Sequence, residues 1–294
     1  MIPQFEFIRP QNIQETISVL AQYKSDARLI AGGTDIMPGF RQESARFKEI
    51  KVMVDIHHLE ELKTIEKNQS HLLIGAGVTF SQLAIHPDVN LWFPVLVKAA
   101  LGVGSVQIRN RATLAGNFVN NAPCADTVPP LLVYEAVIRI ASQDKKREML
   151  LADFLLSPYH TQLLPDEMVT HILLPIPAAN LRGDFFKLGR RRAVAISRIS
   201  LALVADIRDG VFHELKLASG AITPIGKRFE NIEQLARTKE AKTETYKKLA
   251  KELGKEILEL TGLRWSTPYK LPVVQQAFYQ LLESVCSSVP NQEK

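Results

Sequence analysis

Apolar residues in the first third of the chain alternate between helical spacing and short continuous runs. Ile13, Ile17, Leu20 and Ala21 fall on one face of a helix that Asn12 can cap. Short apolar runs bounded by glycine or polar residues predict strands. We expect strands at 28–31, 52–56 and 72–78, a helix from about Thr79, and a helix over 93–101 that ends at Gly102.

The pattern changes after a polar, Asn-rich loop that follows Gly104. Residues 129–142 predict a proline-started helix running into a strand, and a strand at 169–174 ends at Pro175-Ile176-Pro177. Alternation at 198–208 and 213–219 predicts a hairpin around Asp209-Gly210, and helices are expected at 229–260 and 273–286. The chain therefore predicts an α+β protein with two domains, at 1–177 and 178–294.

Composition narrows the class of protein. A chain of 294 residues with 46% hydrophobic residues is long enough for two cores, and its net charge is only +5. The most basic segment, 227–260, carries nine Lys or Arg but also seven Asp or Glu, which indicates a solvated helix face rather than a nucleic-acid surface. No apolar run approaches 18 residues and the N-terminus does not resemble a signal peptide, so we expect no membrane span and a cytoplasmic location.

Several common chemistries are excluded by spacing. Cys124 and Cys286 are far apart and no C-x-x-C occurs, which argues against a zinc or iron–sulfur site in this chain and fits a reducing compartment. No P-loop, H-E-x-x-H or G-x-S-x-G motif occurs, and neither Gly75-x-Gly77 nor Gly102-x-Gly104 is followed by the third glycine of a dinucleotide fingerprint.

Two glycine-containing loops remain as candidate binding elements. In Ala31 to Asp35, "AGGTD", the glycines permit positive φ, so consecutive N–H groups can turn inward and bind an anion such as a pyrophosphate. The alternative is a plain tight turn. Residues 107–130 form a second polar loop, in which Gly116, Asn117 and Asn120 offer donors and Asp126 offers a carboxylate to sugar hydroxyls. The alternative there is a wet surface loop.

Together these segments resemble the FAD-binding subunits of molybdenum hydroxylases, such as bacterial xanthine dehydrogenase and carbon monoxide dehydrogenase. The resemblance rests on "LIAGGTDI" (29–36), "IGAGVTF" (74–80), "QIRNRATLAGN" (107–117), the Asp126 that follows, and "FFKLGRRRA" (185–193). It covers nearly the whole chain. It implies a PCMH-type (vanillyl-alcohol-oxidase-like) FAD-binding domain followed by a small α+β C-terminal domain of the CO dehydrogenase flavoprotein type.

The resemblance also implies a set of cofactor-binding residues. The first loop would wrap the FAD pyrophosphate, the second would form a phosphate and ribityl loop, Asp126 would accept from a hydroxyl, and Ile196 would lie against the flavin ring. The implied FAD-binding residues are Leu29, Ile30, Ala31, Gly32, Gly33, Thr34, Asp35, Ile36, Val103, Thr113, Leu114, Ala115, Gly116, Asn117, Asn120, Asp126, Val169, Lys187 and Ile196. No catalytic or metal-binding residue is expected.

The implied function is electron transfer. A molybdopterin-binding large subunit would oxidise the substrate, and [2Fe–2S] clusters of a small subunit would pass electrons to this FAD and then to NAD⁺ or another acceptor. The loop 189–195 is basic where NAD⁺-reducing relatives often carry acidic residues, so the acceptor stays open. Its arginines are either solvated or directed at an anionic cofactor or at an acidic surface of a partner. Two alternatives remain: a stand-alone FAD-dependent oxidase or reductase, and a non-catalytic basic binding module.

Overall fold

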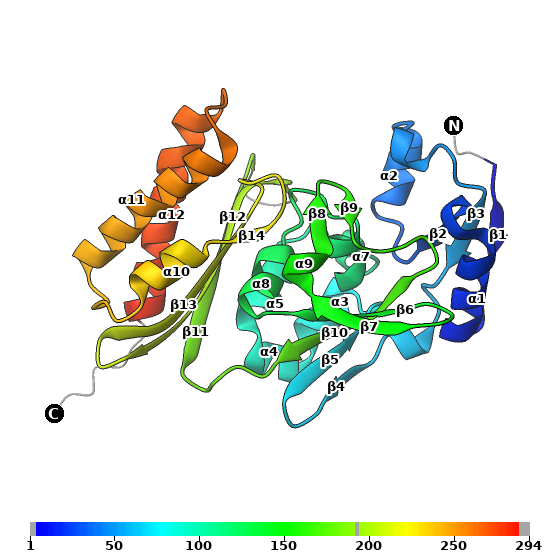
Figure 1. Ribbon diagram of the computed structural model, residues 1–294, viewed down its shortest axis with the longest axis horizontal. Helices are drawn as coiled ribbons and strands as arrows, with labels where there is room; N and C mark the ends of the chain where they lie inside the picture. The colour runs from blue at the N-terminus through cyan, green and yellow to red at the C-terminus, as the bar shows by residue number, and fades with distance from the viewer. Residues whose placement is uncertain (1–3, 192–193, 288–294) are drawn as a thin grey trace.

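The computed structural model describes residues 4–191 and 194–287. Within them the chain forms an N-terminal part up to β10 and a C-terminal part from β11 onward (Figure 1). The N-terminal part begins with a parallel sheet of order β1-β3-β2, with α1 on the connection between its edge strands. Its elements are β1 (Glu6–Ile8), α1 (Ile13–Tyr23), β2 (Ala27–Ile30), α2 (Ile36–Arg41) and β3 (Val52–Asp55), with short 3-10 turns η1 (Lys24–Asp26), η2 (Ala45–Phe47) and η3 (Glu60–Leu62).

An antiparallel sheet of order β4-β5-β10-β6-β7 and a group of short helices complete this part. The strands are β4 (Ile65–Lys67), β5 (His71–Gly75), β6 (Val137–Ala141), β7 (Lys146–Leu150) and β10 (Met168–Pro175), with a separate ribbon of β8 (Leu155–Ser157) and β9 (His160–Thr161). The helices are α3 (Phe80–Ile85), α4 (Pro87–Trp92), α5 (Pro94–Leu101), α6 (Val106–Arg109), α7 (Leu114–Val119), α8 (Val128–Val133) and α9 (Leu151–Phe154).

The C-terminal part is an antiparallel sheet of order β11-β12-β13-β14 covered on one face by helices. Its elements are β11 (Leu181–Gly189), β12 (Ser197–Arg208), β13 (Val211–Gly220), β14 (Lys227–Arg228), α10 (Glu230–Ala236), α11 (Thr243–Thr261) and α12 (Thr267–Ser287). In Figure 1 this sheet stands between α10–α12 on one side and α5 and α8 on the other. The mixture of helices and antiparallel sheets confirms the α+β class.

Strand β12 explains how the two parts pack together. Leu201 and Leu203 belong to the core shared with α10–α12, whereas Ala202 and Val204 belong to the core of the N-terminal part. Because successive side chains of a strand point to opposite faces, a strand buried on both faces reads as a nearly continuous apolar run. The run "ISLALVADI" is that signature.

Several sequence-based predictions are confirmed locally. Asn12 caps α1 by accepting from the Glu15 N–H at 2.8 Å, and Thr79 caps α3 in a capping box with Gln82. Asp209 and Gly210 turn the β12–β13 hairpin with φ values of 50° and 72°, as a two-residue turn of this kind requires.

Three expectations about the elements were wrong. The helix expected over 229–260 is split into α10 and α11, because Thr238 donates to the Phe212 carbonyl and Val211 pairs with Glu240, which draws this segment to the hairpin. The strand expected over 72–78 ends at Gly75, where the backbone turns toward α3. The Asn-rich segment is not an open loop, because α6 and α7 lie within it.

Candidate functional site

The first candidate loop connects β2 to α2. Gly33 has a φ of +73°, and its carbonyl accepts from the Met37 N–H at 3.0 Å. Within residues 4–191 and 194–287, no hydrogen-bond acceptor is found for the five consecutive N–H groups of residues 32–36. Unpartnered backbone donors are costly unless a ligand or water binds them. The loop therefore has backbone donors available to an anion, and the predicted binding of a pyrophosphate there stays a prediction.

The side chains of this segment are directed mostly away from a ligand. Ile30 and Ile36 pack, with Met37, against a small core formed by Phe40, Phe47, Ile50 and Met53. Leu29 and Ala31 pack against the larger core. The predicted contacts of these residues with a cofactor must therefore be made largely by backbone. Thr34 is half-buried, and Asp35 is exposed.

The second loop lies directly on the first. A β-carbon built on Gly32 would lie 2.0 Å from the carbonyl oxygen of Arg111 and 2.9 Å from the Ala112 nitrogen. The N–H groups of Phe80 and Leu114 bind the Ala112 and Val78 carbonyls at 3.1 and 3.0 Å. The segments near residues 78 and 112 are thus joined by backbone hydrogen bonds, and the backbone at residue 32 packs closely against the segment at 111–112.

The donors expected on the second loop are partly engaged within the chain. Thr113 caps α7, and its hydroxyl accepts from the Gly116 N–H at 3.0 Å. The Asn117 side-chain oxygen accepts from the Thr127 hydroxyl at 2.7 Å. The expectation that Gly116 offers a free backbone donor was therefore wrong, because the segment is the first turn of a capped helix. Leu114 and Ala115 are buried.

Asp126 and Lys187 form an ion pair between the two parts of the chain. The Lys187 Nζ lies 2.6 Å from Asp126 Oδ2 and 2.8 Å from the Gly102 carbonyl oxygen, and the Ser197 hydroxyl donates to Asp126 Oδ1. Burial raises the pKa of Asp126, while Lys187 and Ser197 act in the opposite direction. The sequence named both members of the pair but missed Ser197, which adjoins the predicted Ile196.

Asn120 and the apolar candidates occupy different environments. Asn120 ends α7, and its side-chain oxygen accepts from Arg46 at 2.8 Å. Val103 is half-buried after α5, and its carbonyl accepts from Arg109 at 3.1 Å. Val169 is buried in β10, beside the register shift that follows it, and Ile196 is 76% exposed. No sequence pattern pointed to Arg46, which comes from outside every motif.

Cys124 is subject to charges from both loops and from β11. Burial raises the pKa of the Cys124 thiol, and the charges of Asp126 and Asp35 act in the same direction, while Lys187 opposes them.

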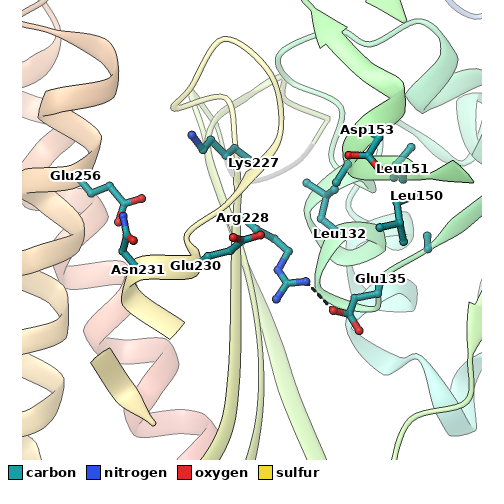
Figure 2. A pocket seen from close by; sticks show the side chains of 12 residues that line it. Leu132, Glu135, Leu150, Leu151, Asp153, Lys227, Arg228, Glu230, Asn231 and Glu256 are labelled. Atoms are coloured by element: carbon teal, nitrogen blue, oxygen red, sulfur yellow. Dashed lines mark hydrogen bonds and ion pairs between the residues drawn. The ribbon is translucent and has the colours of Figure 1, made fainter. Parts of the chain in front are cut away.

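A cavity of about 400 Å³ lies elsewhere on the boundary between the two parts (Figure 2). It is lined by residues of α8, β7, α9, β14, α10 and α11, including Glu135 and Arg228, whose ion pair of 2.8 Å crosses it. The predicted site residues do not line this cavity. It is therefore a separate feature from the glycine loops.

Two further properties concern the residues described. Among residues 4–191 and 194–287, no three His, Cys, Asp or Glu side chains come together as a metal site. No helix in these ranges is long and apolar enough to cross a membrane.

In the basic loop, Arg190 and Arg191 are exposed, and Arg191 donates to the Val194 carbonyl at 2.9 Å. Arg192 and Ala193 lie outside the described residues.

Comparison with known proteins decides the family. Residues 3–177 match the model of the FAD binding domain in molybdopterin dehydrogenase, and residues 184–285 match that of the CO dehydrogenase flavoprotein C-terminal domain. The chain belongs to the family of molybdenum hydroxylase FAD-binding subunits. The resemblance inferred from the sequence is confirmed, and FAD is the cofactor of the N-terminal domain.

Individual members of this flavoprotein family are similar over most of their length. The xanthine dehydrogenase FAD-binding subunit of Escherichia coli O157:H7 is 31% identical over 269 residues, covering 91% of each chain. The nicotinate dehydrogenase FAD-subunit of Eubacterium barkeri is 30% identical over 286 residues, covering 96% of each. A solved structure of carbon monoxide dehydrogenase from Hydrogenophaga pseudoflava superposes with a TM-score of 0.90 at 25% identity, covering 98% of this chain and 99% of that one.

The geometry fits a flavin dinucleotide. Five N–H groups without an acceptor in the described part of the chain suit a diphosphate, and the close approach at Gly32 leaves no room for a side chain between the two loops. The polar groups near Asp126 suit hydroxyls of a ribityl or ribose unit. Residues of both loops, and of β11, could thus hold FAD along its length.

Proposed function

We propose that this chain transfers electrons within a heteromeric molybdenum hydroxylase. A molybdopterin-binding large subunit oxidises the substrate, and the [2Fe–2S] clusters of a small subunit deliver electrons to the FAD of this chain. The final acceptor is NAD⁺ or another oxidant. When bound, FAD supplies the chemistry of accepting and releasing electrons, and this chain binds and orients it. The division into domains at residues 1–177 and 178–294, and a cytoplasmic location, are parts of the same proposal.

The observation that carries this proposal is the run of N–H groups at residues 32–36 that have no acceptor among the residues described, in a loop whose Gly32 packs against the Arg111 backbone. We assign the pyrophosphate to this run. The region of Thr113–Asn117 and Asn120 is assigned to the phosphate and ribityl portion, and Asp126 and Lys187 to polar groups of the cofactor. Val103, Val169 and Ile196 are assigned to its apolar contacts.

The hydrogen bonds of the Asp126 carboxylate favour electron transfer over acid–base chemistry on a substrate. A general base needs a proton acceptor that is free to meet the substrate. Both oxygens of Asp126 already bind Ser197 and Lys187. The ion pair therefore suits a fixed positioning role, which argues against a stand-alone oxidase or reductase.

The proposal is tested by producing the chain alone and by isolating it together with the chains that purify with it, which we expect to be a molybdopterin-binding large chain and a [2Fe–2S] small chain. We expect the isolated chain to be yellow, with about one FAD per chain, and inert toward purines, aldehydes and N-heterocycles. In the assembled complex, a substrate of the molybdenum subunit should bleach the flavin absorption. Rapid turnover by the isolated chain would favour the stand-alone enzyme, and a colourless chain that cannot be reconstituted would contradict both.

A further inference from the structure

Arg46 joins three segments around the candidate site. It lies in η2, after α2, and its Nη1 donates to the Asn120 side-chain oxygen at 2.8 Å. Its guanidinium carbon lies 4.0 Å from the centre of the Tyr159 ring, between β8 and β9. Figure 1 places α2 and the β8–β9 ribbon at the same upper edge of the molecule. Arg46 thereby connects the segment after the first loop to the end of α7.

No carboxylate among residues 4–191 and 194–287 forms an ion pair with Arg46. In the part of the chain that the structure describes, neither Arg46 nor Arg28 forms an ion pair. Burial lowers the pKa of Arg28, and the Arg46 charge lowers it further. Although Asp35 is exposed as a residue, partial desolvation of its carboxyl raises its pKa, and the Arg46 charge opposes that rise. Arg46 thus acts electrostatically on Arg28 in β2 and on Asp35 at the end of the first loop. Its neighbour Phe47 belongs to the small core against which Ile30 and Ile36, on either side of that loop, pack.

Two arginines, Arg28 and Arg46, and one carboxylate, Asp35, interact electrostatically beside N–H groups that have no acceptor among the residues described, and such a site suits an anionic ligand. A diphosphate carries two negative charges and many acceptor oxygens, and charge-assisted hydrogen bonds are the stronger kind. Arginine also suits this position better than lysine. Its planar guanidinium can stack on Tyr159, bind Asn120 and still keep N–H groups free, which a single ammonium cannot do.

We propose that Arg46 is a positioning residue for the dinucleotide diphosphate. Held by Asn120 and Tyr159, it supplies positive charge to the cradle at residues 32–36 and fixes the spacing between the two loops. This inference rests on FAD binding by the chain. It assigns a role to a residue that lies outside every motif of the sequence.

The test compares FAD with riboflavin, which has the flavin ring but no phosphate. Dissociation constants are measured by fluorescence on the flavin-free full chain at several salt concentrations. Arg46→Gln should weaken FAD binding about 10- to 100-fold and make it less dependent on salt, while riboflavin binding is unchanged. Arg46→Lys should keep the salt dependence but recover only part of the affinity. Arg41→Gln, at the exposed end of α2, is the matched control and should bind like wild type.

Tyr159→Leu provides a second variant, which keeps the charge and removes the aromatic face. It should weaken FAD binding less than Arg46→Gln does, with the salt dependence of wild type. Equal weakening of FAD and riboflavin in Arg46→Gln would show a merely structural role and overturn the proposal. Unchanged FAD affinity in that variant would also overturn it. A wild-type chain that binds neither flavin would instead refute the proposed cofactor function.

Discussion

The carbonyl oxygen of Arg111 lies 2.0 Å from the point that a β-carbon on Gly32 would occupy. Two loops about 80 residues apart therefore meet backbone to backbone, and only glycine permits that contact. Beside this contact, the N–H groups of residues 32–36 form no hydrogen bond with an acceptor among the residues described. The contact explains the glycine at position 32, and the free N–H groups are the donors of the proposed anion cradle.

Gly32 and Gly33 should respond differently to alanine. Gly32→Ala would force the Arg111 backbone to move, so we expect loss of FAD retention and a lower free energy of unfolding. Gly33→Ala meets only side-chain atoms at 3.4 Å or more and keeps its N–H, so it should cost about 1 kcal/mol from the positive φ and retain FAD. The flavin content after gel filtration measures FAD retention, and urea unfolding measures the free energy of unfolding of each variant. Equal flavin content in the two variants would refute the backbone contact as the reason for Gly32.

The pair of Lys187 and Asp126 should behave as a coupled unit. Lys187→Met leaves a buried carboxylate without its counter-charge, which costs about 3–5 kcal/mol in comparable sites. Asp126→Asn leaves the Lys187 ammonium group without its counter-charge and should also destabilise the chain. The double variant should recover most of the loss, because neither charge is then left alone. Urea unfolding of all four proteins gives the coupling, and simple additivity of the two losses would contradict the pairing.

Glu135 should hold the two parts together in a pH-dependent way. Burial acts to raise the pKa of Glu135, but Lys216 and Arg228 outweigh it, so the pKa is lowered. A lowered pKa means that the stabilisation is fully present above the unfolded value of 4.5 and is lost as pH falls through the folded value.

The expected size of this effect is modest, about 1 kcal/mol, because the side chain is 45% exposed. Glu135→Gln should lower the free energy of unfolding near neutral pH and flatten its fall in acid. Glu230→Gln, which lines the same cavity without an ion pair among the residues described, is the matched control. If the free energy of unfolding falls with pH in the same way in wild type and in Glu135→Gln, the proposed role of Glu135 is contradicted.

Local signals in the sequence predicted the local structure well. Asn12, Thr79 and the Asp209-Gly210 turn each act within four residues of themselves, so their effects can be inferred from spacing alone. The break between α10 and α11 could not be inferred, because the pairing of Val211 with Glu240 imposes it and no proline or glycine marks it.

The sequence indicated the candidate residues that lie in motifs, but not those that join the site only through contacts between distant segments. The glycine loop and the members of the Asp126–Lys187 pair were found through motifs, although the pairing itself joins residues 61 apart. Arg46 was missed because its partner Asn120 is 74 residues away and no pattern links the two. The free donor expected at Gly116 was wrong because the Thr113 cap had not been inferred.

The central claim is that the N–H groups of residues 32–36 bind the diphosphate of FAD. Amide hydrogen exchange of these five residues, measured on the flavin-free chain and on the chain saturated with FAD or riboflavin, tests it directly. We predict strong protection of these amides by FAD and little by riboflavin. Unchanged exchange at residues 32–36 in a chain fully loaded with FAD would contradict the claim.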